Sequence, residues 1–144
     1  MPVFSNSEQV YAVMKTLLDR IKEKDPKAAQ RLVNSRLILR LRLRQPEAEI
    51  TINARHNPLE FEYGHSSLRP DLQLDVSADA LHYILTGQLR FSKVLGSGQL
   101  KLHGPVWKAF VLQDLLRHLQ ALYPLVLREY GIDPPPLTSS GLHS

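Results

Sequence analysis

The chain has 144 residues, of which 43% are hydrophobic, and its 18 lysines and arginines against 14 acidic residues give a formal net charge of +4. This length suits one domain with a sizeable core, and the absence of cysteine excludes disulfides and thiolate metal sites. No apolar run approaches the roughly 20 residues that span a bilayer. The first residues do not resemble a secretory signal, so we expect a cytoplasmic location.

The N-terminal part of the chain predicts two helices. Apolar residues recur at helical spacing over residues 8–24, and Ser7 is in the position of an N-cap. We expect this helix to end at Asp25, because the proline that follows disfavours helical geometry in the residue before it. Pro26 then suits the first turn of a short second helix.

Five later segments alternate between apolar and polar residues, which predicts strands. Their apolar positions are Leu37, Leu39, Leu41 and Leu43, then Ile50, Ile52 and Ala54, then Leu59, Phe61 and Tyr63, then Leu72, Leu74 and Val76, and finally Leu100 and Leu102. Such alternation is typical of a sheet with one buried face and one solvated face, and these sheets are usually largely antiparallel. We therefore expect an α+β fold with five strands.

Three arginines, Arg40, Arg42 and Arg44, lie on the polar side of the first of these strands. A nucleic-acid site would need aromatic stacking partners or a basic helix nearby, and this face offers neither, so we expect no nucleic-acid binding. The expected explanation is cross-strand charge pairing with acidic residues on the same face, namely Glu60, Glu62, Asp71 and Asp75.

Two more helices are predicted towards the C-terminus. The first begins at a cap supplied by Ser77 or Asp79 and ends near Gly87. The second begins with Pro105 in its first turn, and Pro124 kinks or ends it. Its apolar stripe is wider than one contact face needs. An ordinary core helix is one explanation, and a cavity or tunnel between this helix and the sheet is the other.

The chain is expected to form a single domain over residues 1–131. Residues 132–144 contain three consecutive prolines followed by threonine, serine and glycine, a composition that is typical of disorder.

Glycines are concentrated in residues 85–104. A phosphate-binding loop would need a lysine and a hydroxyl residue after its last glycine, at the start of a helix, whereas a strand is predicted after Gly98. The segment therefore indicates a sharp turn into that strand, or the close approach of an apolar ligand. Four apolar residues of the segment would line such a ligand site: Leu89, Phe91, Val94 and Leu95.

No pattern in the sequence indicates catalysis or metal binding. The histidines stand at positions 56, 65, 82, 103, 118 and 143, and no two are three or four residues apart on a helix. Gly-Ser-Gly at residues 96–98 is not the nucleophile-elbow pattern of serine hydrolases. We expect no metal, no cofactor and no enzymatic activity.

The stretch DLQLDVSADALHYILTGQLRFSKVLGSGQLKLHG, residues 71–104, resembles the sterol carrier protein 2 domain family. In that family a strand leads into a helix that ends in a Thr-Gly step, here Thr86-Gly87. A strand of the pattern Gly-x-Leu-x-hydrophobic-x-Gly follows, here residues 98–104, and then the closing helix with Leu112-Gln113. The resemblance covers roughly residues 8–130 and implies a mostly antiparallel sheet with one face covered by helices and an apolar cavity between them.

The resemblance also implies a function, which is non-enzymatic binding or transfer of a fatty acyl, isoprenoid or sterol-like lipid. The net positive charge suits transient contact with an anionic membrane surface. The lipid is expected to contact Ile84, Leu85, Leu89, Phe91, Val94, Leu95, Trp107, Phe110, Val111 and Leu115, with a polar head group near Lys93 or His82. The alternative is an interaction module that docks on a partner or self-associates through its last helix. A monomer and a homodimer are both compatible with the sequence.

Overall fold

The computed structural model describes residues 2–95 and 97–132. Its helices are α1 (Ser7–Lys24), α2 (Pro26–Ser35), α3 (Ala78–Leu85), α4 (Phe91–Val94) and α5 (Ala109–Glu129), with a 3-10 turn, η1 (Val106–Lys108), before α5. Its strands are β1 (Ile38–Arg44), β2 (Ala48–Asn53), β3 (Glu60–Tyr63), β4 (Leu72–Ser77) and β5 (Leu100–His103). Of the tail predicted to be disordered, residues 133–144 lie outside the described residues.

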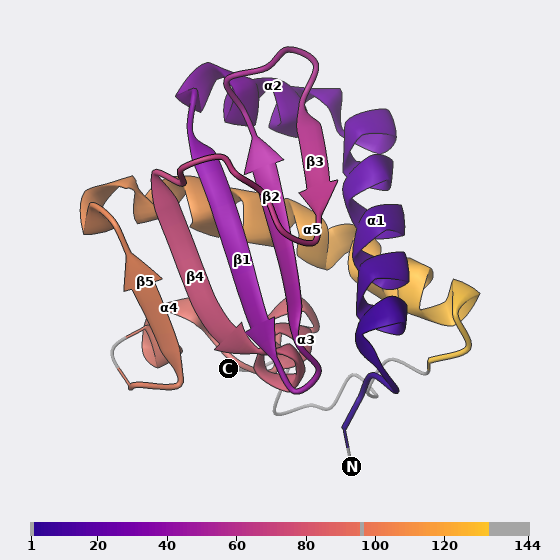
Figure 1. The fold of residues 1–144 in the computed structure, drawn as a ribbon. Helices are drawn as coiled ribbons and strands as arrows, with labels where there is room; N and C mark the ends of the chain where they lie inside the picture. The colour runs from indigo at the N-terminus through magenta and orange to yellow at the C-terminus, as the bar shows by residue number, and fades with distance from the viewer. Residues whose placement is uncertain (1, 96, 133–144) are drawn as a thin grey trace.

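The five strands form one sheet in the order β3-β2-β1-β4-β5, with the helices on one side of it (Figure 1). Three neighbouring pairs are antiparallel, whereas the central pair, β1 and β4, is parallel. The predicted α+β class and five strands are confirmed, and the sheet is mixed. The parallel pair arises because the chain leaves the edge strand β3 and crosses the sheet before it joins β1 from the other side as β4.

The inner face of the sheet is apolar across every strand. Leu41, in the middle of β1, lies between Ile50 of β2 and Leu74 of β4. The same register continues to both edges, where Tyr63 pairs with Ile50 and Leu102 pairs with Leu74. Helices α1 and α5 pack against each other and cover this face with α3, so the predicted one-sided sheet is confirmed (Figure 1).

The outer face carries the predicted charges, but the pairs differ from those expected. Arg40 forms an ion pair with Glu49 of β2 at 3.3 Å, and its guanidinium also donates to the carbonyl oxygen of Ser66 at 3.3 Å. Ser66 belongs to the connection that crosses from β3 to β4. Asp71 pairs instead with Arg55. Cross-strand pairing is therefore found for Arg40, but with an acidic partner that was not expected, because the partners depend on strand order and on this crossing segment, which alternation does not report.

The helix ends follow local chemistry with small differences from prediction. The side chain of Asn6 caps α1 through the backbone N–H of Gln9, and Ser7 is the first helical residue. Ser77 caps α3 as expected. Helix α5 continues past Pro124 to Glu129, although a proline removes one backbone hydrogen bond. Tyr123 before Pro124 and Val126 and Leu127 after it are fully buried in the core, and this burial holds the helix together.

Candidate functional site

A small apolar cavity lies between the inner face of the sheet and the helices. Its volume is about 50 Å³, and it is lined by Met14 and Leu18 of α1, by Leu39, Arg40, Leu41, Ile50, Ile52 and Leu74 of the strands, by Leu81 and Leu85 of α3, and by Leu112, Leu115, Leu116 and Leu119 of α5. Leu39 and Leu43 are buried, yet Leu41 between them is only half-buried. The helices therefore leave the middle of the central strand incompletely covered.

A larger groove runs on the outside between α2 and the first turns of α5. Its volume is about 460 Å³, and it is lined by Ala28, Arg31, Leu32, Asn34 and Ser35 of α2 and by Phe110, Val111, Asp114 and Leu115 of α5. Leu115 lines both the groove and the cavity. One layer of side chains on α5 therefore separates the outer groove from the interior.

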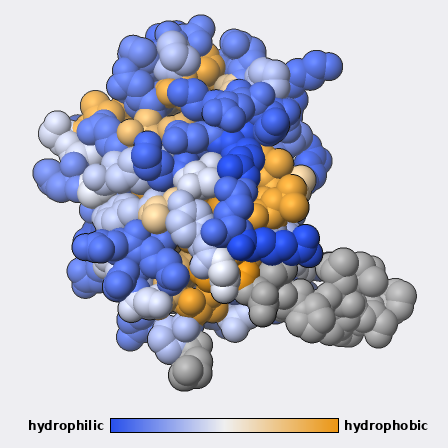
Figure 2. All heavy atoms as spheres, turned by 90° about the vertical axis from the view of Figure 1, so that its right-hand side faces the viewer, coloured by the Kyte–Doolittle hydropathy of each residue, from blue (hydrophilic) through white to orange (hydrophobic). Residues whose placement is uncertain are grey.

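The two ends of α5 are held very differently. Near its C-terminal end, Tyr123, Val126 and Leu127 are fully buried, Glu129 pairs with Arg20 of α1, and the hydroxyl of Tyr130 donates to the carbonyl oxygen of Ala12 at 3.0 Å. This is the side of the molecule shown in Figure 2, where a largely hydrophilic surface surrounds apolar areas on the right and below.

The N-terminal end of α5 is exposed. Trp107 is 72% exposed, and Val106 and Phe110 are each 65% exposed. Neither η1 nor α5 has a side-chain hydrogen bond at its N-cap. Apart from the ion pair of Asp114 with Arg31 of α2 at 3.1 Å and the burial of Ala109 and Leu112, few interactions hold the first turns of α5 against the rest of the fold, whereas its last turns are anchored on α1.

The structure separates the ten residues predicted to contact lipid into four groups. Leu85 and Leu115 line the cavity, and Phe110 and Val111 join Leu115 in the groove. Trp107 lies on the surface. The remaining five lie in the core or at its edge, outside both linings: Ile84, Leu89, Phe91, Val94 and Leu95. The role of all ten in lipid binding stays a prediction.

Sequence reasoning missed the strand residues and several helix residues that line the cavity. The missed positions are apolar residues on the inner faces of β1, β2 and β4, together with Met14 and Leu18 of α1, Leu81 of α3, and Leu112, Leu116 and Leu119 of α5. A signal for the strand positions was present in the alternation that predicted the buried face. A cavity beneath the centre of a sheet must be walled by the residues of that face, so the same pattern identifies them.

His82, near which a head group was predicted, lies in the core. Its Nδ1 atom is hydrogen-bonded to the hydroxyl of Tyr123 at 2.8 Å, and the ring of Phe4 packs edge-on against it. His82 does not line the cavity, and Lys93 is exposed on the surface. Burial lowers the pKa of His82 below its ordinary value, while the nearby carboxylate of Asp79 opposes this shift.

The neutral state of His82 predicts a loss of stability in mild acid. As the pH falls below about 6.5, the unfolded chain takes up a proton at this position and the folded chain does not. The stabilisation is therefore complete above that pH and declines below it, by up to about 1.4 kcal/mol per pH unit. Urea unfolding between about pH 7.5 and pH 5 measures the decline, and the variant His82→Gln should show a shallower one. Equal slopes for the two proteins would contradict this role.

Within residues 2–95 and 97–132, no group of three or more histidine, aspartate or glutamate side chains is placed to hold a metal ion. In the same part of the chain, no helix combines the length and the hydropathy needed to cross a membrane.

Comparisons with known proteins agree with this architecture. The model of the SCP-2 sterol transfer family matches residues 15–117. No curated protein matches the chain. Among solved structures, the sterol carrier protein domain 2 of Helicoverpa armigera is similar with a TM-score of 0.64 and 22% identity, over 78% of this chain and 88% of that one.

Two further solved structures share the fold. Sterol Carrier Protein 2 from Yarrowia lipolytica in its apo form has a TM-score of 0.60 and 19% identity, over 79% of this chain and 91% of that one. Palmitated SCP2L2 from Aedes aegypti has a TM-score of 0.55 and 17% identity, over 76% and 95% of the two chains. At these identities the likeness concerns the fold.

Proposed function

Because this chain belongs to the SCP-2 sterol transfer family, we propose that it holds a hydrophobic lipid between its sheet and helices α1, α3 and α5, and transfers that lipid without bond chemistry. The observation that carries this proposal is the incomplete cover over Leu41 at the centre of the sheet. Empty cavities lined by apolar side chains stay dry, and larger ones accept apolar ligands. The walls contributed by the helices are entirely apolar, which suits an acyl, isoprenoid or sterol-like group.

The cavity must expand to accept such a ligand. Binding sites for small molecules measure about 300–1,000 Å³, and the cavity has about 50 Å³. The groove beside α2 offers about 460 Å³ on the other side of Leu115. We propose that the first turns of α5 move away from the sheet, which joins groove and cavity, while the anchored end on α1 stays in place. In this account Leu85, Phe110, Val111 and Leu115 keep the lining role predicted for them.

The energetics suit a carrier that both loads and unloads. Transfer of each methylene from water to an apolar site is worth about 0.8 kcal/mol, and a bilayer offers the same chain a similar gain. Net exchange between bilayer and protein is then close to neutral. The palmitated relative makes a long-chain fatty acid the first ligand to offer this chain.

Native mass spectrometry combined with lipid extraction of the same purified sample tests the proposal. We expect an added mass that is lost on denaturation and recovered in the extract, or uptake of palmitate by protein from which lipid has been removed. A bare mass, with no uptake of fatty acid, isoprenoid or sterol, would contradict it.

The alternative function is docking on a partner through the last helix, and the exposed apolar residues at the beginning of that helix support it. Trp107 and Phe110 are available there, whereas the C-terminal end of α5 already packs on α1. In native mass spectrometry this alternative would appear as a complex of the protein with a partner or a second copy that contains no lipid.

A further inference from the structure

We infer that the exposed start of α5 docks on an anionic lipid bilayer. This inference rests on the proposed function for its purpose, which is exchange of lipid with a membrane, but the docking itself can be measured without a bound ligand. The surface concerned has an apolar part, formed by Val106, Trp107 and Phe110, and a basic rim, formed by Arg36, Arg69 and Lys108.

The apolar part matches what inserts at a bilayer interface. Val106, Trp107 and Phe110 are the three most exposed large apolar side chains of the described residues, and they lie within one turn and a half of chain. Exposed apolar groups that gather in this way mark interaction sites. Tryptophan in particular favours the level of the lipid head groups, because its ring is amphipathic.

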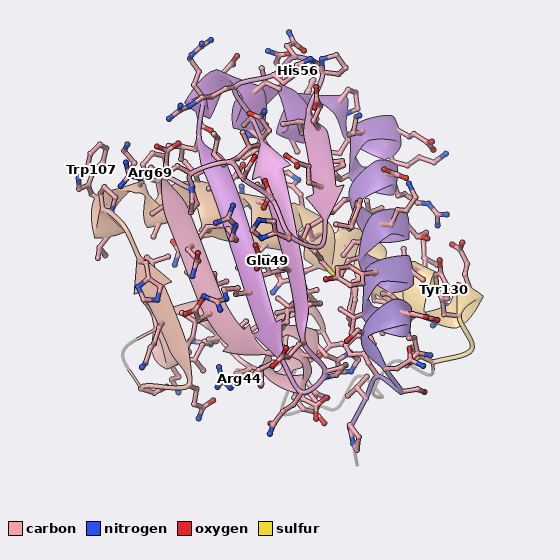
Figure 3. The ribbon with its side chains drawn as sticks, viewed as in Figure 1. Arg44, Glu49, His56, Arg69, Trp107 and Tyr130 are labelled. Atoms are coloured by element: carbon pink, nitrogen blue, oxygen red, sulfur yellow. The ribbon has the colours of Figure 1, made fainter. Side chains whose placement is uncertain are left out.

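The basic rim lies beside these side chains. The ammonium group of Lys108 is 5.2 Å from the centre of the Trp107 ring. In Figure 3 Arg69 and Trp107 are labelled at the same edge of the molecule, and the close packing of Gly104 on the backbone of Asp71 brings their two segments together. Arg36 directly follows Ser35, the last residue of α2, which lines the groove together with Phe110, and the side chain of Arg55 donates to the carbonyl oxygen of Arg36 at 3.2 Å.

The charges at this end of the molecule are unbalanced. Asp71 is neutralised by Arg55 at 2.9 Å, and Asp114 is neutralised by Arg31 at 3.1 Å. Among residues 2–95 and 97–132, the three rim residues form no ion pair. The rim is therefore positive around an apolar centre, which complements anionic head groups over acyl chains. A symmetric second copy would instead bring like charges together, so we infer a bilayer.

Docking in this orientation would place the groove at the membrane. Phe110 belongs both to the docking surface and to the wall of the groove, and the groove meets the cavity at Leu115. A lipid that leaves the bilayer would enter the groove beside Phe110 without crossing water. The same first turns of α5 that must move for loading would be the ones in contact with the bilayer.

Trp107 is the single tryptophan of the chain, so its fluorescence reports docking directly. With vesicles of equal parts phosphatidylcholine and phosphatidylglycerol, we expect its emission to shift to the blue and brominated lipid to quench it. With pure phosphatidylcholine the change should be weaker, and salt should reduce it, because salt screens exposed charges. Unchanged emission with anionic vesicles would overturn the inference.

Variants separate this surface from general charge effects. Reversing Arg69 and Lys108 together, as Arg69→Glu with Lys108→Glu, should weaken binding to anionic vesicles by about tenfold or more. The control Arg44→Glu, on an exposed residue at the other end of the sheet, should change it little (Figure 3). Phe110→Ser should reduce quenching, whereas Leu125→Ser, on the anchored end of α5, should not. Equal binding by the double variant and wild type would overturn the inference.

Two further readouts complete the test. If the blue shift of Trp107 appears on concentrating the protein alone, with a dimer in sedimentation, a second copy occupies the surface and the inference is overturned. Uptake of a soluble fluorescent fatty acid is measured in parallel. If wild type takes up the fatty acid but does not dock, the docking inference fails and lipid binding stands. If it docks but takes up no lipid offered, the proposed function fails.

Discussion

Replacing Leu41 with tryptophan is expected to lower the affinity for a long-chain fatty acid by about a hundredfold, which corresponds to about 2.7 kcal/mol. Leu41 projects from the centre of the sheet into the cavity, where the helices leave it half-buried. A larger ring at this position would fill the space in which the ligand begins to be accommodated. Because room already exists there, the protein should fold, with an overpacking penalty of about 1–3 kcal/mol.

The variant Leu41→Ala supplies the opposite change at the same position. It enlarges the cavity, so lipid uptake should be kept or increased while stability falls. Affinity is measured by native mass spectrometry against offered palmitate, and circular dichroism confirms that each variant is folded. Folded Leu41→Trp that binds palmitate like the wild type would place the ligand elsewhere.

Replacing Gly104 with alanine is expected to destabilise the fold by about 2–4 kcal/mol. Gly104 has a φ of +116°, and an added Cβ would lie 2.4 Å from the carbonyl oxygen of Asp71 and 3.0 Å from a methyl group of Leu72. The first contact is with backbone at the start of β4, which cannot rotate away. Either β5 moves from its neighbour or the turn into η1 is rebuilt, and urea unfolding measures the loss.

Gly98 provides the control for backbone conformation. It has a φ of +87°, and an added Cβ at this position would meet no atom within 4 Å. Gly98→Ala should therefore cost only the conformational penalty of about 1–2 kcal/mol. If the two variants lose the same stability, the close contact between Gly104 and Asp71 is not a constraint on the fold.

The sequence allowed most of the fold to be predicted, because its elements follow from local patterns. The alternation of Leu39, Leu41 and Leu43 identifies both a strand and its buried face, and Ser77 identifies the start of α3. The direction of a strand relative to its neighbours cannot be predicted from such local patterns. Whether β4 runs parallel to β1 depends on a crossing between segments far apart in the chain, and no periodicity within either strand records it.

The candidate site could be predicted only in part. Glycines directed attention to residues 85–104, but the cavity brings together Met14 of α1, Leu41 of β1 and Leu116 of α5. An apolar side chain that walls a cavity has the same sequence signature as one that fills a core. The exposure of Trp107 could not be inferred for the same reason, since an aromatic residue at helical spacing is usually buried.

Methyl NMR of leucine-labelled protein titrated with palmitate tests the central claim most directly. The account predicts that the largest shift changes occur at the leucines that line the cavity, such as Leu41 and Leu116, and not at Leu59, which is buried elsewhere. Changes confined to the surface near Leu125, or no change with palmitate, an isoprenoid or a sterol, would contradict a lipid site between sheet and helices.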